Sequence, residues 1–270
     1  MLLKSLVMGT VEGTTEFLPI SSTGHLILAG DLLNFLGRDK RSIYEIFIQL
    51  GAMLAVVWEY RTKLACTIMG AIRPGPERRL LIGVLLAFVP SAAVGLLLGS
   101  AIKEFLFSPV PVALAFIVGG FIILWAERRP HDLRAPDLDD ISIKDAFLIG
   151  LMQCLALIPG TSRSGATIIG GLFLDLSRRA STEFSFILGI PTLGAASLYS
   201  LYKVRNELDA GDAGIFTFGF VAAFISAFIA IRALLRFISR HTFVGFAWYR
   251  IVFGLLVLLT AWSGIVHLSV

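Results

Sequence analysis

Long uncharged runs constrain this chain more than any other feature of its sequence. Five stretches run for 19 to 23 residues without a charged side chain, and a helix needs ~20 residues to span the hydrocarbon core of a bilayer. They are residues 80–102, 106–126, 184–202, 213–231 and 251–270. A shorter stretch, 46–60, contains Gln49 and Glu59 but precedes a basic loop, and is predicted to be a sixth crossing. The sequence therefore predicts an all-α polytopic membrane protein.

The composition agrees with that fold class and excludes others. Hydrophobic residues make up 56% of the 270 residues and charged residues 16%, whereas soluble domains are about 25% charged. The net charge of +4 comes from Lys and Arg spread through loops, so we expect contact with membrane lipid and no nucleic-acid partner. Cys66 and Cys154 match no metal or redox spacing. Glu12 and Glu16 interrupt the first apolar segment, which argues against a signal peptide.

The distribution of cations between loops predicts the orientation in the membrane. With six crossings, fourteen cations share one side and seven the other, so the richer side is predicted to be cytoplasmic and both termini external. The fourteen are Arg61, Lys63, Arg73, Arg78, Arg79, Arg128, Arg129, Arg134, Lys144, Arg178, Arg179, Arg232, Arg236 and Arg240. The seven are Lys4, Arg38, Lys40, Arg41, Lys103, Lys203 and Arg205. This assignment requires that segments 5–30 and 145–175 return to the side from which they enter.

Both of those segments are apolar helix patterns broken midway by proline and small polar residues. Lipid-exposed backbone does not tolerate such a break, so both are predicted to be re-entrant helical hairpins. The first reads "GTVEGTTEFLPISSTGH" and the second "GLMQCLALIPGTSRSGAT". The matched pairs are Gly9 with Gly150, Glu12 with Gln153, Pro19 with Pro159, Ser22 with Ser162, and Gly24 with Gly165.

These matches predict an internal repeat within a single membrane domain, residues 1–270. The first repeat is 1–126, the second is 145–270, and a cytoplasmic linker, 127–144, joins them. Each repeat holds one hairpin and three spans. Because three is odd, the second repeat enters the membrane from the opposite side, and the two broken segments are predicted to meet near the midplane.

The helix starts after the two breaks have the residues of an anion site. "SSTG" and "TSRSG" are rich in N-cap residues, so free backbone N–H groups and positive helix ends face the breaks. Arg163 adds a planar guanidinium that suits phosphate oxygens. The structural alternative for this arginine is an ion pair with Glu12 or Glu16. The candidate diphosphate-binding residues here are Ser21, Thr23, Ser162, Arg163, Ser164 and Gly165.

Glu12 and Glu16 lie four residues apart and so share one helix face. Two carboxylates in a low dielectric repel each other unless one is protonated or a cation lies between them. The pair suits proton transfer, or a divalent cation, Mg²⁺ or Ca²⁺, that bridges to phosphate. His25 follows near the same helix start and has the chemistry of a general base, general acid or nucleophile. The alternatives are a glutamate that only faces a water-filled mouth and a histidine that only packs in the core.

Three segments carry a resemblance to a known family. "EGTTEFLPISSTGH", "PGTSRSGAT" and "EFSFILGIP" resemble the signature motifs of the undecaprenyl-pyrophosphate phosphatase family, also called the bacitracin-resistance family, and the likeness covers nearly the whole chain. The resemblance implies a bacterial inner-membrane enzyme that converts C55 polyprenyl diphosphate to the monophosphate and inorganic phosphate. It thereby recycles the lipid carrier of cell-wall synthesis and confers bacitracin resistance. The resemblance also implies dependence on a divalent cation, a homodimer, and an active site open to the periplasm.

The resemblance also assigns roles to individual residues. The family's catalytic residues fall on Glu12, Glu16, Ser22, His25 and Arg163. Its arginine motif falls on Ser162, Arg163 and Thr167, which adds Thr167 to the diphosphate-binding set. Ser22 is the first choice as nucleophile, and His25 then either activates Ser22 or protonates the leaving oxygen. A water molecule activated by a glutamate or by His25 stays open as the alternative.

A secondary transporter or lipid flippase is the competing function, because inverted repeats with broken helices are also a transporter architecture. Transport needs anion binding, whereas hydrolysis also needs a nucleophile and groups that move protons. Ser22, His25 and the two glutamates supply both, so hydrolysis is the favoured interpretation. The prenyl tail is expected to lie in an apolar groove between spans.

Two further features are predicted to be structural. Arg250, inside the last span, is expected to pair with a backbone carbonyl or with an acidic group such as Glu45 or Glu183. The tryptophans lie near span ends or within the last span and are expected to anchor the protein at the membrane interface. They are Trp58, Trp125, Trp248 and Trp262.

Overall fold

The computed structural model describes the whole chain except residues 107, 131, 206–209 and 263–270, and its described part is almost entirely helical. The α-helices are α1 (Leu2–Thr15), α2 (Ser22–Leu32), α3 (Arg38–Glu59), α4 (Arg61–Gly70), α5 (Pro76–Leu106), α6 (Pro109–Arg128), α7 (Ile143–Gln153), α8 (Arg163–Phe173), α9 (Arg178–Lys203), α10 (Ala213–Ile238) and α11 (Val244–Trp262). Short 3₁₀ helices are η1 (Leu138–Asp140), η2 (Cys154–Leu157) and η3 (Ala210–Asp212). The all-α fold class is confirmed.

Five of these helices contain segments that are long and apolar enough to cross a membrane. The segments are Lys40–Glu59, Pro76–Gly99, Val110–Arg128, Arg178–Lys203 and Ala213–Ile238. The predicted sixth crossing, 46–60, thus belongs to a full-length helix, α3. The last predicted span starts earlier than residue 251, because α11 begins at Val244 with a shorter apolar segment, Val244–Thr260. Residues 263–270 of that span lie outside the described residues.

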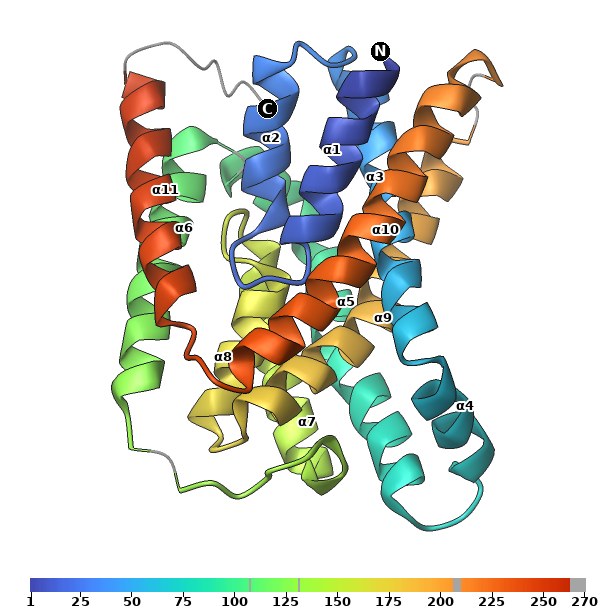
Figure 1. Ribbon diagram of the computed structural model, residues 1–270, viewed down its shortest axis with the longest axis vertical. Helices are drawn as coiled ribbons and strands as arrows, with labels where there is room; N and C mark the ends of the chain where they lie inside the picture. Colours follow the sequence, from blue (N-terminus) through green and yellow to red (C-terminus); the bar gives the residue numbers. More distant parts are fainter. Residues whose placement is uncertain (107, 131, 206–209, 263–270) are drawn as a thin grey trace.

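The two predicted hairpins are present as helix–break–helix units. Their four α-helices, α1, α2, α7 and α8, have 14, 11, 11 and 11 residues. At ~1.5 Å per residue each is too short for the ~30 Å hydrocarbon core. In Figure 1 the α1–α2 hairpin enters from the end that holds the N-terminus and returns to it. The α7–α8 hairpin enters from the opposite end, so the two breaks approach each other in the middle of the bundle.

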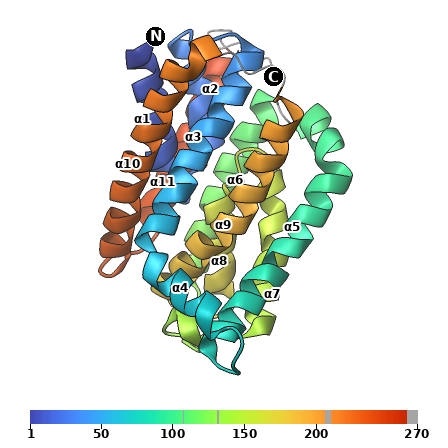
Figure 2. The same ribbon diagram turned by 90° about the vertical axis from the view of Figure 1, so that its right-hand side faces the viewer.

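The loops divide between the two ends of the bundle as the cation count requires. Figures 1 and 2 show α4 and the connection between α6 and α7 at the end opposite the N-terminus. The turns between α8 and α9 and between α10 and α11 lie at that same end (Figure 1). The loops richest in Arg and Lys therefore share one end of the molecule.

Each hairpin packs its first helix against a helix of the other half of the chain. Helix α1 lies along α10, and α7 lies along α5. A Cβ atom added at Gly9 would lie 2.2 Å from the carbonyl oxygen of Gly219, and one at Gly150 would lie 2.4 Å from that of Ala87. Only glycine allows backbones to approach so closely. The glycines matched in the sequence repeat thus serve the same purpose in both hairpins.

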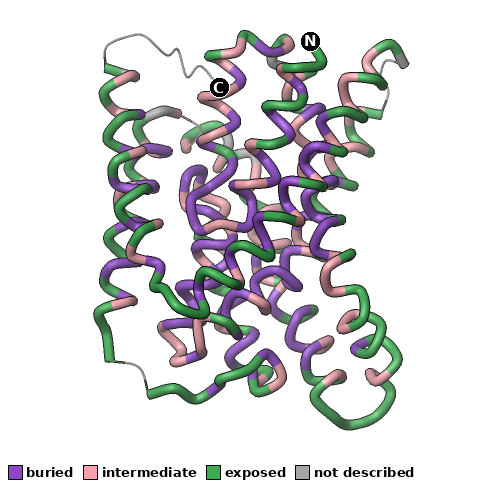
Figure 3. Tube along the Cα trace, viewed as in Figure 1, coloured by how far each residue is buried: buried purple, intermediate pink, exposed green. Residues whose placement is uncertain are grey.

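The buried residues surround the two hairpin breaks. In Figure 3 the buried residues gather along the centre of the bundle, around both hairpin breaks, while the outer faces of the long helices are exposed. Phe17, at the first break, is fully buried and meets Phe186 edge to face at 5.4 Å. Large apolar side chains such as Leu97 and Trp125 are exposed on the outside, which suits contact with lipid tails. The core therefore holds the two breaks at the centre of the molecule.

Candidate active site

Both hairpin breaks end in a serine with a left-handed backbone. Ser21 precedes α2 with φ of 68°, and Ser162 precedes α8 with φ of 74°. A positive φ at a non-glycine residue costs about 1–3 kcal/mol and persists only where the surroundings enforce it. The two helices that face the centre of the bundle thus start from strained N-cap residues of the same kind.

This geometry corrects one detail of the predicted repeat. Ser21 corresponds to Ser162, with the same difference of 141 that relates Glu12 to Gln153. The predicted match of Ser22 with Ser162 is therefore wrong by one residue, and Ser22 corresponds to Arg163. The prolines favour the wrong match, because Pro19 lies two residues before its N-cap serine and Pro159 three, whereas Gly24 and Gly165 already keep the difference of 141.

Arg163, Glu16 and Ser22 meet where the two hairpins face each other. Ser22 Oγ donates a hydrogen bond to Glu16 Oε2 at 2.5 Å, and Arg163 Nη2 lies 3.2 Å from Glu16 Oε1. The arginine and glutamate side chains are only 9% and 6% exposed. Removing one partner of such a buried ion pair costs about 3–5 kcal/mol. The predicted structural alternative for Arg163 thus holds in this structure, and its partner is Glu16.

Arg163 is also fixed from α9. Its Nη1 donates to the carbonyl oxygen of Ser185 at 2.8 Å, and its guanidinium lies over the Phe17 ring, 5.6 Å from the centroid. Its buried Nε has no hydrogen-bond partner among the described residues. The guanidinium is therefore held in place while its Nε–H stays unpaired among the described residues.

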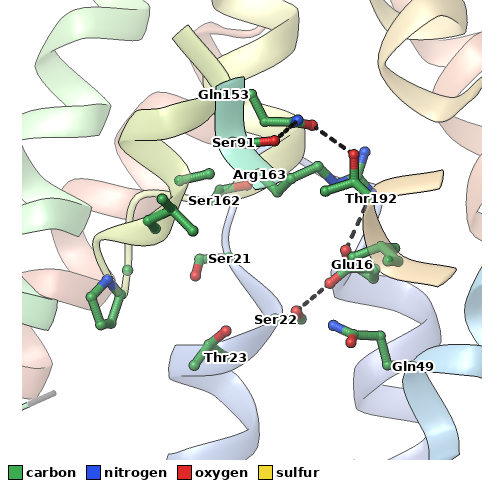
Figure 4. A pocket seen from close by; sticks show the side chains of 15 residues that line it. Glu16, Ser21, Ser22, Thr23, Gln49, Ser91, Gln153, Ser162, Arg163 and Thr192 are labelled. Carbon is green, nitrogen blue, oxygen red and sulfur yellow. Dashed lines mark hydrogen bonds and ion pairs between the residues drawn. The ribbon is translucent and has the colours of Figure 1, made fainter. Parts of the chain in front are cut away.

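A cavity of about 200 Å³ opens beside this group (Figure 4). The polar residues that line it are Glu16, Ser21, Ser22 and Thr23 from the first hairpin, Gln153, Ser162 and Arg163 from the second, and Gln49, Ser91 and Thr192 from α3, α5 and α9. Apolar lining comes from Ala156, Leu157, Pro159, Gly160 and Leu193. Because both hairpins and three long helices contribute, the cavity depends on the tertiary fold rather than on any one segment.

One wall of the cavity was missed by sequence reasoning. Gln153 Nε2 donates to Ser91 Oγ at 2.7 Å, and Thr192 Oγ1 donates to Gln153 Oε1 at 3.3 Å. The sequence indicates Gln153 only as the repeat partner of Glu12. A signal for the other two was present, because Ser91 and Thr192 each directly follow a proline inside an apolar span, Pro90 and Pro191.

Several residues predicted to bind diphosphate lie behind the cavity instead of lining it. Ser164 Oγ donates to the carbonyl oxygen of Leu18 at 2.8 Å, which ties the second break to the first. Gly165 N donates to Ser162 Oγ at 3.0 Å as a helix cap. Thr167 is fully buried and donates to Ser185 Oγ at 2.7 Å. Their contacts hold the second break in position.

Glu12 lies one turn before Glu16 and is 1% exposed. Its Oε2 has no hydrogen-bond partner among the described residues, although it is buried. Within those residues no group of three or more His, Cys, Asp or Glu side chains gathers that could hold a metal ion. Glu12 thus offers one free hard oxygen beside the group that contains Glu16 and Ser22.

His25 does not face the cavity in this structure. Its Nδ1 lies 2.7 Å from the carbonyl oxygen of Ser21, so this nitrogen carries the hydrogen, and its Nε2 lies 2.6 Å from Tyr249 Oη. The ring stacks on Phe253 at 4.3 Å. The predicted contact between His25 and Ser22 is absent from the described hydrogen bonds, in which the Ser22 hydroxyl donates to Glu16.

Arg250 bonds to carbonyls, which is one of the two alternatives predicted for it. It is 1% exposed, and its acceptors are the carbonyl oxygens of Phe116, Pro19, Thr161, Ala115 and Gly160. Two of these acceptors belong to α6 and the other three to the hairpin breaks. The predicted acidic partners Glu45 and Glu183 are not among them.

Comparison with known proteins supports the assignment of a family. The family model described as "Bacitracin resistance protein BacA" matches residues 5–256. The chain is 69% identical over its whole length to "Undecaprenyl-diphosphatase 1" of Chromobacterium violaceum, of which it covers 100%. It is 60% identical to "Undecaprenyl-diphosphatase 2" of Rhodospirillum rubrum and 59% identical to "Undecaprenyl-diphosphatase" of Cellvibrio japonicus, covering 98% of each. The family match spans both hairpins and the cavity between them, and on this evidence the chain belongs to the bacitracin resistance protein BacA family.

Proposed function

We propose that this protein hydrolyses undecaprenyl diphosphate to undecaprenyl phosphate and inorganic phosphate, which recycles the lipid carrier of cell-wall synthesis and underlies bacitracin resistance. The single observation that carries the proposal is the group formed by Ser22, Glu16 and Arg163 beside a polar cavity in the centre of the bundle. Relatives that are 56–69% identical to this chain are named as undecaprenyl-diphosphatases. The activity is therefore proposed from both the site and its relatives.

The geometry suggests how the chain's own groups act. Ser22 Oγ attacks the terminal phosphorus and Glu16, already its hydrogen-bond acceptor, takes the proton. The bond to the bridging oxygen breaks, undecaprenyl phosphate leaves, and water later releases phosphate from the serine. Arg163 and the free N–H groups at the start of α8 stabilise the charge on the transferred group. Direct attack by a water molecule would use the same base.

Two measurements distinguish these routes. A phosphorylated Ser22 trapped by rapid acid quench and located by mass spectrometry would support the serine as nucleophile. Ser22→Ala is then expected to abolish the trapped species and lower turnover at least 100-fold, since the covalent route is lost. Residual turnover close to that of the unmodified protein would assign the attack to water.

A divalent cation, Mg²⁺ or Ca²⁺, is proposed to bind at Glu12 and Glu16. The unpartnered Oε2 of Glu12 supports this, and the Glu16 oxygens, although bonded to Arg163 and Ser22, each keep a further lone pair. The bound ion would offset charge on the phosphate oxygens of the substrate. In metal-stripped protein, added Mg²⁺ should raise the thermal midpoint, and Glu12→Gln should remove that increase. Turnover that persists in chelator would argue against the ion.

The protein is proposed to lie in the bacterial inner membrane with the cation-rich loops in the cytoplasm, both termini outside and the site open to the periplasm. The first hairpin would then enter from the periplasm and the second from the cytoplasm, as an inverted repeat requires. The pairing of α1 with α10 and of α7 with α5 supports that repeat, because each half contributes to the other in the same way. A homodimer is proposed from the family resemblance alone, and its mass in detergent would test it.

Single cysteines test the orientation in a background without Cys66 and Cys154. A cysteine at Gly211 should react with an impermeant thiol reagent outside intact cells, and one at Gly75 should not. The C-terminal position Ser269 should also react, but it lies outside the described residues. If the cysteine at Gly75 were labelled and the one at Gly211 protected, the orientation in the membrane would be the reverse of the one proposed.

The decisive experiment measures phosphate release from undecaprenyl diphosphate by the purified protein. Release by the unmodified protein, and its loss in Glu16→Gln, would support hydrolysis. Protein that binds the lipid without releasing phosphate, yet moves it between the leaflets of a vesicle, would instead be a flippase. The hairpins that enter from opposite ends give that alternative its structural basis.

A further inference from the structure

Arg250 has no carboxylate among the hydrogen-bond acceptors that the described residues provide, although it is buried at the centre of the bundle. Its Nε donates to Phe116 O at 3.3 Å and one Nη2 hydrogen to Ala115 O at 3.0 Å, both on α6. The other donors reach the hairpin breaks, and their acceptors are Pro19 O at 3.1 Å, Thr161 O at 2.9 Å and Gly160 O at 2.9 Å. A guanidinium has five N–H donors, and here five carbonyls accept them.

A buried arginine in a membrane protein needs such complete pairing. A buried cation is tolerated only when its hydrogen bonds are satisfied, because desolvation otherwise outweighs any gain. Three of the acceptors belong to residues at the tips of two different hairpins, Pro19 on one and Gly160 and Thr161 on the other. Arg250 is therefore the one side chain in the described structure that donates hydrogen bonds to the backbone of both breaks.

The carbonyls bound to Arg250 also fix the directions of neighbouring amides. In a trans peptide the N–H points opposite to the C=O. The carbonyl of Thr161 faces Arg250, so the N–H of Ser162 faces the other way. Ser162 lines the cavity, and its N–H donates none of the backbone hydrogen bonds found among the described residues. Arg250 thus fixes the direction of an N–H group that belongs to a cavity-lining residue.

We propose that Arg250 is a positioning residue for the diphosphate site, which holds the peptide planes of both breaks so that Glu16 and Ser22 stay aligned with Arg163 and the Ser162 amide faces the bound anion. This inference rests on the proposed function. Arg250 does not line the cavity in the described structure, so it acts through the backbone rather than by touching the substrate.

The test compares Arg250→Lys and Arg250→Met in the full-length protein. Lysine keeps the charge but has three donors instead of five, and methionine has none. The kcat for undecaprenyl diphosphate should fall roughly 10- to 100-fold in the lysine variant, as small misalignments do, and further in the methionine variant, with KM changed less. Amide hydrogen exchange should quicken in segments 16–24 and 158–165 more than in the long helices.

Tyr44→Phe is the matched control. Tyr44 is fully buried and its hydroxyl donates to the carbonyl oxygen of Ser5 at 2.7 Å, near the other end of α1. The variant should lose stability without a comparable loss of kcat and without faster exchange at the breaks. Exchange that rises evenly along all helices in Arg250→Lys would show that Arg250 only stabilises the fold, and would overturn the proposal.

A double-mutant cycle adds an independent readout. If Arg250 acts through the alignment of Arg163, the combined Arg163→Lys and Arg250→Lys variant should lose less activity than the product of the single losses. Fully multiplicative losses would contradict the proposal. Absence of phosphate release by the unmodified protein would instead refute the proposed function, and the exchange experiment would still test the role of Arg250 at the breaks.

Discussion

The first and second hairpins share a helix–break–helix plan and have opposite chemistry. Both break a helix at the centre of the bundle and restart it after a serine with positive φ, Ser21 in one and Ser162 in the other. At corresponding positions the first has Glu12 where the second has Gln153, and Ser22 where the second has Arg163. The break and the serine with positive φ are therefore common to both hairpins, whereas the reactive groups differ.

This difference suits the proposed site, which has to bind an anion and also act on it. Two copies of the second hairpin would form a cationic site without a base, and two copies of the first would place carboxylates together without a counter-charge. Joining one of each brings Arg163 within 3.2 Å of Glu16 and places Ser22, the proposed nucleophile, in hydrogen-bond contact with the same glutamate. Each of the following predictions changes one side of that asymmetry.

The largest effect is expected for Glu16→Gln. This change removes the acceptor of the Ser22 proton and leaves Arg163 buried without its partner, so turnover should fall about 10³- to 10⁴-fold. Phosphate release by purified protein measures it. A control, Glu59→Gln, breaks the exposed Arg232–Glu59 pair of 2.9 Å and should have little effect. Turnover within tenfold of the unmodified protein would exclude Glu16 as the base.

Arg163→Lys removes the planar fork from the second hairpin and keeps its charge. A single ammonium cannot bond Ser185, Glu16 and a phosphate oxygen with the same geometry, so kcat should fall about 10²- to 10³-fold. The same assay measures it, with membrane insertion checked by expression level. Arg232→Lys is the matched control on the exposed surface. A rate near that of the unmodified protein would contradict the anion-binding role.

Gln153→Glu makes the second hairpin acidic like the first. A carboxylate on the cavity wall repels the diphosphate, so KM should rise roughly tenfold with a smaller change in kcat. Steady-state kinetics separates the two parameters. Gln153→Leu loses the bond to Ser91 without adding charge, and its KM should change less. Equal increases of KM in both variants would show that the charge at position 153 does not control substrate binding at this wall of the cavity.

The smallest effect is expected for Tyr249→Phe. This variant tests whether His25 takes part in the reaction together with Glu16 and Ser22 of the first hairpin. The variant removes the partner of His25 Nε2 and keeps the stack on Phe253. Because this histidine faces away from the cavity, kcat/KM should change less than about threefold, as for one lost peripheral hydrogen bond. A loss above thirtyfold with a displaced pH profile would instead implicate His25 in proton transfer.

The fold and most of the site could be predicted because polar, charged and helix-breaking residues are rare in membrane-spanning segments and therefore stand out in the sequence. Proline and serines inside apolar helices reveal both breaks, and Glu16 and Arg163 are conspicuous where charge is rare. The sequence could not decide whether Arg163 pairs with Glu12 or Glu16, since that depends on the register of the two tips. The acceptors of Arg250 were equally hidden, because every residue has a carbonyl and only the fold selects which ones it bonds.

The pairing of the first hairpin with α10 has a consequence for biosynthesis. Helix α1 consists of Leu2–Thr15, whereas its packing partner is Ala213–Ile238, so the hairpin emerges from the ribosome long before the helix that covers it. Until then its broken backbone has neither the α10 surface nor the Arg250 side chain to satisfy it, and lipid offers no hydrogen bonds. The nascent N-terminal hairpin must therefore wait in a protected or water-accessible setting, and assembly of the catalytic centre is among the last events in the maturation of the chain.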